Sequence, residues 1–237
     1  KQLINQLRKM MFKIINTCLF MMACSPVISF ANQSTGALQK FVPHDWEILS
    51  QAKGDLNQDG KEDIALLIQP KNKHLHKRKL LILLKTDQQL QLKLSQHIPK
   101  WTYRANEPCA ENALDDSSLN IKNQRLELLF NSMSSCSNTY GLITTYSFKL
   151  NQNDFHLIGY DSSYLDKITG QQDEISINLL TRKAKLSTTP NIFAEVETPP
   201  KVIWKTIKSA KSYTMETIPW ENEALVFNFS AQFIGEK

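Results

Sequence analysis

Short apolar or alternating runs separated by polar turns recur through most of the chain, and they constrain the fold more than any other feature. The clearest pair, residues 144–150 and 155–160, is rich in β-branched and aromatic side chains and flanks the Asn/Asp-rich turn 151–154. This pattern is typical of a β-hairpin. The same reasoning predicts strands over residues 64–68, 80–84, 90–94, 119–121, 126–130, 174–179, 184–188 and 225–229.

Strands at this short spacing favour a mainly β fold with little helix, built of antiparallel sheets arranged as a sandwich or a partial propeller. Three prolines make residues 189–201 an irregular crossover, and apolar spacing predicts a short helix over residues 202–210. Since 41% of the 237 residues are hydrophobic and 22% are charged, the composition excludes disordered, collagen-like and coiled-coil chains.

The N-terminal residues have the layout of a secretory signal peptide. Lys9 and Lys13 flank the apolar run 14–30, and the small residues Ser29 and Ala31 predict cleavage after Ala31. The sequence therefore predicts an exported protein, most simply a periplasmic one.

The leader also suggests how the whole chain is organised. Met10 and Met11 are candidate starts, and a start at Met11 would place residues 1–10 upstream of the translated protein. Residues 32–40 are polar and are expected to form a tether. Residues 41–237 are expected to form one β-rich domain.

Two other interpretations of the leader remain open. An uncleaved membrane anchor is disfavoured because the run 14–30 would span roughly 26 Å as a helix, against a hydrocarbon core of about 30 Å, and contains Asn16 and Pro26. Residues 21–24 resemble a bacterial lipobox, although Met21 stands where leucine is usual. That alternative predicts a lipoprotein anchored through Cys24.

Loss of the leader removes most of the net positive charge. The chain has 28 basic and 23 acidic residues, and residues 1–31 hold four of the basic ones and none of the acidic ones, which leaves a net charge of +1. Nucleic-acid binding is therefore not expected. Residues 70–79 are expected to form a turn or solvated loop, and the basic stretch 71–79 could instead contact a polyanion or an envelope component. His74 and His76 could bind a transition metal there, but the neighbouring lysines oppose a cation.

Two cysteines, Cys109 and Cys136, remain in the mature part. In an oxidising compartment they would pair most simply, and closing this loop would stabilise the fold by about 3.5 kcal/mol. The alternative is a free thiol nucleophile, which neither sequence neighbourhood supports.

The strongest chemical motif is Asp55-x-Asn57-x-Asp59-Gly60-x-x-Asp63. Calcium prefers six to eight oxygen ligands, and a tight loop supplies them from alternate positions. The expected ligands are the side chains of Asp55, Asn57, Asp59 and Asp63 and the backbone carbonyl of Lys61, which Gly60 would turn inward.

The loop departs from a complete EF-hand because Leu66 occupies the position of the bidentate Glu. We therefore expect weak calcium binding, at about 10⁻⁴–10⁻³ M, with a structural role. The alternative is an Asp/Asn/Gly turn that is held by hydrogen bonds and binds no ion.

Residues 41–49 and 53–66 resemble the opening of uncharacterised bacterial exported proteins that carry one calcium loop similar to the FG-GAP, integrin-alpha type repeat. Residues 155–161 and 175–181 resemble later segments of those proteins, so the similarity covers residues 41–187. It implies a calcium-binding, β-rich envelope protein and assigns no enzymatic activity. A complete propeller of this type needs several such loops, and the chain has one.

The sequence favours a non-enzymatic binding or envelope module. A periplasmic hydrolase assembled from distant residues is the alternative, because no recognisable catalytic motif is present. Asp115 and Asp116 could form an acid/base pair but are more typical of a turn. Four tryptophans could line a ligand groove or fill the core: Trp46, Trp101, Trp204 and Trp220.

Overall fold

The computed structural model describes residues 34–72, 75, 77–87, 89–99, 113–132, 139–207, 211–222 and 229–234. The chain divides into two compact units, residues 1–40 and 41–237. The described part of the first unit contains the short helix α2 (Ser34–Gln39), within the stretch expected as a polar tether.

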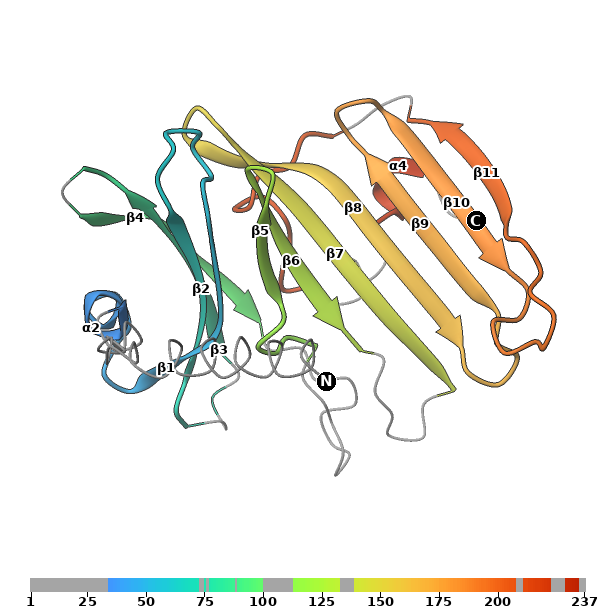
Figure 1. Cartoon of the computed structure of the whole chain (residues 1–237), viewed down its shortest axis with the longest axis horizontal. Coiled ribbons are helices and arrows are strands. Elements are labelled where there is room, and N and C mark those ends of the chain that lie inside the picture. The colour runs from blue at the N-terminus through green and yellow to red at the C-terminus, as the bar shows by residue number, and fades with distance from the viewer. Residues whose placement is uncertain are drawn as a thin grey trace, which may run out of the picture. The chain divides into compact units, whose positions relative to one another are not determined.

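The second unit is mainly β, as predicted, and contains two antiparallel sheets whose strands follow one another in chain order (Figure 1). The four-stranded sheet consists of β1 (Trp46–Gly54), β2 (Asp63–Pro70), β3 (Lys77–Lys85) and β4 (Leu90–Pro99). The seven-stranded sheet consists of β5 (Leu119–Lys122), β6 (Arg125–Asn131), β7 (Tyr140–Asn151), β8 (Asp154–Asp166), β9 (Gln172–Asn178), β10 (Lys183–Thr189) and β11 (Lys201–Thr206). The helix α4 (Ala231–Ile234) follows near the C-terminus.

The predicted hairpins of the seven-stranded sheet are confirmed. Their turns contain residues with positive φ, which reverse the chain in step with the strand twist. Asn123 and Gln124 have φ of 51° and 59° between β5 and β6, and Gln152 has 55° between β7 and β8. Arg182 has φ of 55° between β9 and β10.

The apolar run 64–68 lies in β2 and is buried on both faces, as its lack of alternation predicted. Its side chains alternate between two environments. Ala65 and Leu67 belong to the main core, whereas Ile64, Leu66 and Ile68 are buried on the opposite face of the sheet.

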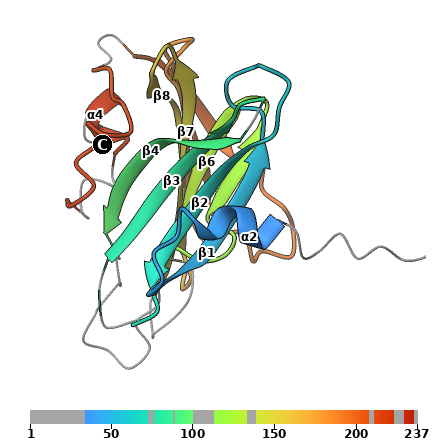
Figure 2. The ribbon, with the colours of Figure 1, turned by 90° about the vertical axis from the view of Figure 1, so that its left-hand side faces the viewer.

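One hydrophobic core joins the inner faces of both sheets to the C-terminal segment. Figures 1 and 2 show this segment, with α4, on one face of the seven-stranded sheet. An aromatic cluster lies at its centre, where the Tyr146 ring is 5.4 Å from Trp220 and 5.5 Å from Phe229. The C-terminal residues in the core are Ile207, Tyr213, Met215, Ile218, Trp220, Phe229 and Phe233.

The helix expected over residues 202–210 is wrong where the structure describes it. Residues 201–206 form the edge strand β11, which pairs with β10 from Lys183↔Thr206 to Thr188↔Lys201. Val202, Ile203 and Trp204 favour the extended conformation, and pairing with β10 satisfies the backbone. Most of the strand expected over 225–229 lies outside the described residues, and Phe229 itself precedes α4 in a turn.

The loop expected over residues 70–79 is wrong at both ends, because Pro70 belongs to β2 and β3 begins at Lys77. Within β3, Arg78 alternates onto the inner face with Leu80 and is only 1% exposed. Its Nη2 donates to Gln69 Oε1 at 3.3 Å, and burial lowers the pKa of Arg78 to about 10. The guanidinium is therefore a buried positive charge at neutral pH.

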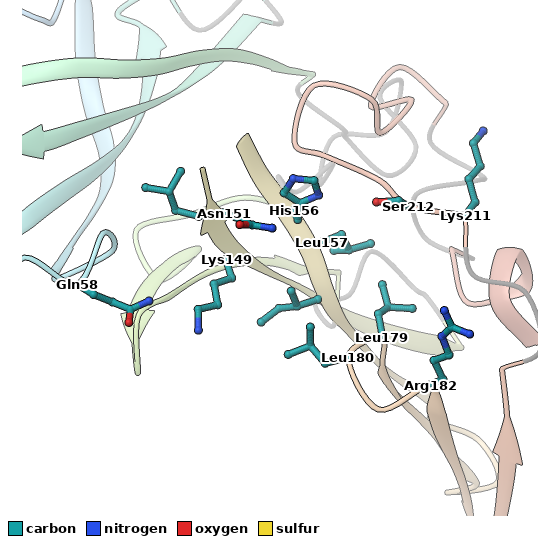
Figure 3. Close-up of a pocket in the computed structure, with 12 residues that line it drawn as sticks. Gln58, Lys149, Asn151, His156, Leu157, Leu179, Leu180, Arg182, Lys211 and Ser212 are labelled. Atoms are coloured by element: carbon teal, nitrogen blue, oxygen red, sulfur yellow. The ribbon is translucent and has the colours of Figure 1, made fainter. Parts of the chain in front are cut away.

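Strand β8 changes neighbours along its length. Residues 159–165 pair with β9, whereas the start of the strand contacts the C-terminal segment. There, Leu157 N–H donates to the Tyr213 carbonyl at 2.9 Å, and Met215 N–H donates to the Phe155 carbonyl at 2.8 Å. A pocket opens beside this change of partner (Figure 3).

Candidate functional site

The acidic loop, residues 55–62, connects β1 to β2. Two residues in it have left-handed backbone, Gln58 with φ of 64° and Gly60 with 78°. Gly54 precedes the loop, and a Cβ there would lie 2.5 Å from Ile121 Cγ2 on β5. A glycine is required at position 54 because the start of the loop passes so close to the neighbouring sheet.

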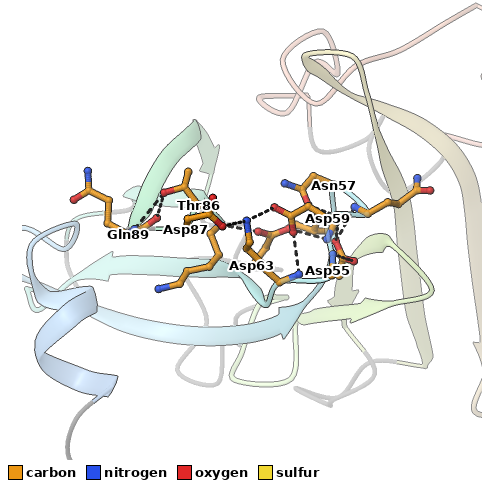
Figure 4. A network of polar contacts seen from close by, with 12 residues as sticks. Asp55, Asn57, Asp59, Asp63, Thr86, Asp87 and Gln89 are labelled. Carbon is orange, nitrogen blue, oxygen red and sulfur yellow. Dashed lines mark hydrogen bonds and ion pairs between the residues drawn. The ribbon is translucent and has the colours of Figure 1, made fainter.

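The side chains at the first, third and fifth positions turn toward the loop's own backbone (Figure 4). Asp55 accepts hydrogen bonds from the N–H groups of Gln58, Asp59 and Gly60 at 2.7, 3.3 and 2.9 Å. Asn57 Oδ1 accepts from Asp59 N–H at 3.1 Å. These bonds hold the loop in a tight coil, in which Asp55 Oδ1 accepts two hydrogen bonds, whereas Asp55 Oδ2 and Asn57 Oδ1 accept one each and keep a second lone pair.

Asp63 differs from the other acids of the motif in its burial, because its side chain is fully buried. Its Oδ2 accepts from Leu56 N–H and its Oδ1 accepts from Lys85 N–H, both at 2.8 Å. Burial raises the pKa of the Asp63 carboxyl, while these two N–H groups lower it. Asp63 therefore fastens the acidic loop to the end of β3.

Lys61 brings a positive charge to the open side of the loop. Its Nζ lies 2.6 Å from Asp87 Oδ1 and 3.7 Å from Asp59 Oδ2. A hydrogen bond from the Lys61 N–H to Asp59, at 2.9 Å, lowers the pKa of the Asp59 carboxyl. Asp59 is thus ionised at neutral pH and is available to a cation, with Lys61 as the resident competitor.

The loop's donor set consists of carboxylate and amide oxygens, which suit a hard cation such as calcium or magnesium. Within the described residues, no three His, Cys, Asp or Glu side chains form a group placed to hold a metal. Coordination would therefore use the remaining lone pairs of Asp55, Asn57 and Asp59, or would require these side chains to turn away from the backbone.

Several other residues singled out from the sequence lie outside the described part of the chain. These are Ala31, Cys24, Cys109, Cys136, His74, His76 and Trp101. Asp115 is in a turn, as expected, where its Oδ1 accepts from Ser117 N–H at 2.9 Å. The backbone carbonyl of Asp116 accepts from Ser50 on β1 at 2.8 Å, so this pair has structural partners.

The tryptophans divide between core and surface. Trp220 is 3% exposed and lies in the aromatic cluster, whereas Trp204 on the edge strand β11 is 65% exposed. Trp46 is half-buried, with the Lys79 ammonium 5.3 Å from its ring centroid.

The pocket beside β8 has a volume of about 560 Å³ and contains residues that sequence reasoning did not connect. Lys149 and His156 are cross-strand partners on β7 and β8, Arg182 lies in the β9–β10 turn, and Lys211 lies in the C-terminal segment. Gln58 of the acidic loop also borders the pocket. The pairing of Lys149 with His156 follows from the predicted hairpin, whereas the approach of Arg182 and Lys211 depends on contacts between segments that no local sequence signal specifies.

A hydrolase would require a histidine paired with a carboxylate or hydroxyl in such a cavity. His156 and Ser212 both line the pocket, but the described structure shows no side-chain hydrogen bond for His156. A histidine–carboxylate pair occurs elsewhere, where His97 Nδ1 lies 3.1 Å from Glu221 Oε1. Both side chains of that pair are exposed on the surface.

Comparison with known proteins finds no matching family model, curated protein or solved structure. The resemblance of residues 41–187 to exported proteins with an FG-GAP-type loop stays a prediction. None of the helices within the described residues is long and apolar enough to cross a membrane.

Proposed function

We propose that the acidic loop is a structural calcium site in an exported, non-enzymatic β-rich binding protein of the cell envelope. The observation that carries the calcium proposal is the tight coil of Asp55, Asn57 and Asp59 around residues 58–61, with Gly60 at the turn. Oxygen-bearing side chains at alternate positions are the arrangement that calcium loops use.

The proposed role follows from the position of the loop. It joins β1 to β2, and Asp63 fastens its end to β3. An ion held by the loop would restrain these three neighbouring strands and neutralise the repulsion among the carboxylates. The proposed role of calcium is therefore to stabilise the four-stranded sheet.

Thermal unfolding tests the calcium site. If the dissociation constant is about 1 mM, then 10 mM calcium stabilises the folded state by about 1.4 kcal/mol, which raises Tm by roughly 3–6 °C. We expect this rise relative to a chelator, and we expect Asp59→Ala to abolish it. Glu62→Ala is the matched control because Glu62 is an exposed neighbour outside the proposed ligand positions.

The calcium proposal fails if 10 mM calcium leaves Tm unchanged, or if Asp59→Ala responds like the wild type. An equal response to magnesium would indicate a general charge effect of the acidic loop instead of a calcium site. The glutamate control should retain the full calcium response.

Export rests on the leader, where Lys9 and Lys13 precede an apolar run that ends before Ala31. Mass spectrometry of the mature protein from the periplasmic fraction should give an N-terminus at Asn32. A lipid-modified N-terminus at Cys24 would support the lipoprotein alternative, and recovery of the intact leader in the cytoplasm would contradict export.

A further inference from the structure

The pocket beside β8 lies where β9 stops pairing with β8. The register shifts between Ser147 and Phe148 where β7 meets β8, and Ile158 falls in the resulting bulge. Leu179 N–H still reaches the Ile158 carbonyl at 2.9 Å, after which the β9–β10 turn leaves β8. The C-terminal segment then takes over as the neighbour of β8, and the cavity of about 560 Å³ lies between these elements.

The ionisable groups that line this cavity are all basic. Lys149, Arg182 and Lys211 contribute three positive charges, and His156 adds a titratable ring. No Asp or Glu is among the described residues that line it. In a chain with a net charge of only +1 after residue 31, this is a local concentration of positive potential in a concave site.

These cations have no carboxylate partner among the described residues. Neither Lys149 nor Arg182 takes part in an ion pair there, and the Lys211 ammonium lies over the Tyr213 ring at 5.0 Å from its centroid. Figure 3 shows Lys149, Arg182 and Lys211 on separate elements around the cavity. An anion entering the cavity would therefore not have to displace an existing partner.

Five of the twelve described residues that line the cavity are apolar. Leu150, Leu157 and Ile158 come from β7 and β8, and Leu179 and Leu180 come from the β9–β10 turn. Leu180 is 69% exposed, so a ligand would remove apolar surface from water. The volume of the cavity, about 560 Å³, lies within the range of small-molecule sites, roughly 300–1,000 Å³.

We propose that this pocket binds an anionic amphiphile, a molecule with one phosphate or carboxylate head and a short aliphatic chain. The head would contact Lys149 and Arg182, since a guanidinium can donate two parallel hydrogen bonds to such an oxyanion. The chain would lie along Leu179 and Leu180. This inference goes beyond the proposed calcium function and does not depend on it.

Calorimetric titration of the full chain with decyl phosphate, below its micellar concentration, tests the proposal. A chelator is present throughout, which prevents precipitation of calcium phosphates and separates the result from occupancy of the acidic loop. Decanol probes the aliphatic part of the ligand without its phosphate, and inorganic phosphate probes the head group without the aliphatic part. We expect decyl phosphate to bind at least tenfold more tightly than either probe, and less tightly as salt is added.

Two variants separate the charged and apolar contributions. The double substitution Lys149→Gln with Arg182→Gln should weaken decyl phosphate binding at least tenfold, and Leu180→Ser should weaken it about threefold. Lys122→Gln with Lys205→Gln is the matched control, because it removes the same charge from exposed positions on β5 and β11.

The proposal is overturned if decyl phosphate does not bind at millimolar concentration, or binds the Lys149/Arg182 variant as tightly as the wild type. Equal binding of decanol would show a purely apolar cavity, and equal binding of inorganic phosphate would show a simple anion site. Equal loss of affinity in the Lys122/Lys205 control would assign the effect to net charge. Circular dichroism of each variant confirms that the sheet content is unchanged.

Discussion

Replacing Asp63 by alanine is expected to lower the free energy of unfolding by about 2–4 kcal/mol. The substitution leaves the N–H groups of Leu56 and Lys85 without their acceptor, and a hydrogen bond to a charged group contributes about 1.5–3 kcal/mol. Removal of a buried charge offsets part of this loss, because burial already raises the pKa of the carboxyl. Urea unfolding followed by tryptophan fluorescence, in the presence of a chelator, measures the change.

Two further variants interpret that result. Asp63→Asn keeps one acceptor oxygen and turns an amide donor toward the other N–H group, so a smaller loss of stability is expected. Glu62→Ala removes the adjacent acid, which makes only an exposed ion pair with Lys53 at 3.4 Å, and should change stability by less than about 0.5 kcal/mol. Equal effects of Asp63→Ala and Glu62→Ala would show that Asp63 does not fasten the loop.

Replacing Trp220 by alanine is expected to cost about 3–5 kcal/mol of unfolding free energy, the range for removing a large buried aromatic side chain. The indole lies 5.4 Å from the Tyr146 ring and 6.2 Å from the Phe130 ring, measured between centroids. Its Nε1–H also donates to the Met215 carbonyl at 2.7 Å, which would lose its donor. The same urea experiment, with Tyr fluorescence or circular dichroism as the signal, measures this loss.

Trp204→Ala is the natural control, since it deletes the same side chain from a position that is 65% exposed. Its effect should stay within about 0.5 kcal/mol. If the two tryptophan variants are equally stable, the C-terminal segment does not complete the core as described.

The sequence predicted the hairpins well because each is specified locally. Alternating apolar residues predict the strands, and the short polar turns at Asn123 and Gln152 predict where the chain reverses. Residues 202–210 show the opposite case, because Val202, Ile203 and Ile207 also fit a helical spacing. Only pairing with β10, which is a tertiary contact, makes residues 201–206 a strand.

Arg78 shows a second limit of local reasoning. A run of basic residues is typical of a solvated loop, yet the strand begins at Lys77 and its alternation directs Arg78 inward. Arg78, Leu80 and Ile82 lie on one face of β3. The basic residues predict a solvated loop, whereas the strand periodicity alone would place Arg78 on the buried face.

The acidic loop was predictable in part. Its residue types and Gly60 follow from the motif, whereas the bond from Lys85 to Asp63 joins residues that are 22 positions apart. The cationic pocket was not predictable, because Lys149, Arg182 and Lys211 meet only through strand register and the path of the C-terminal segment.

The position of that last segment also determines when the protein can fold during synthesis. Until the ribosome has added Tyr213, Met215 and Trp220, the hydrophobic core that the two sheets share lacks part of its side chains. Domains usually fold as cooperative units, so native packing of this core is completed only at a late stage of translation. This order of completion is compatible with the export that we propose, because a chain without its native core can still be translocated unfolded.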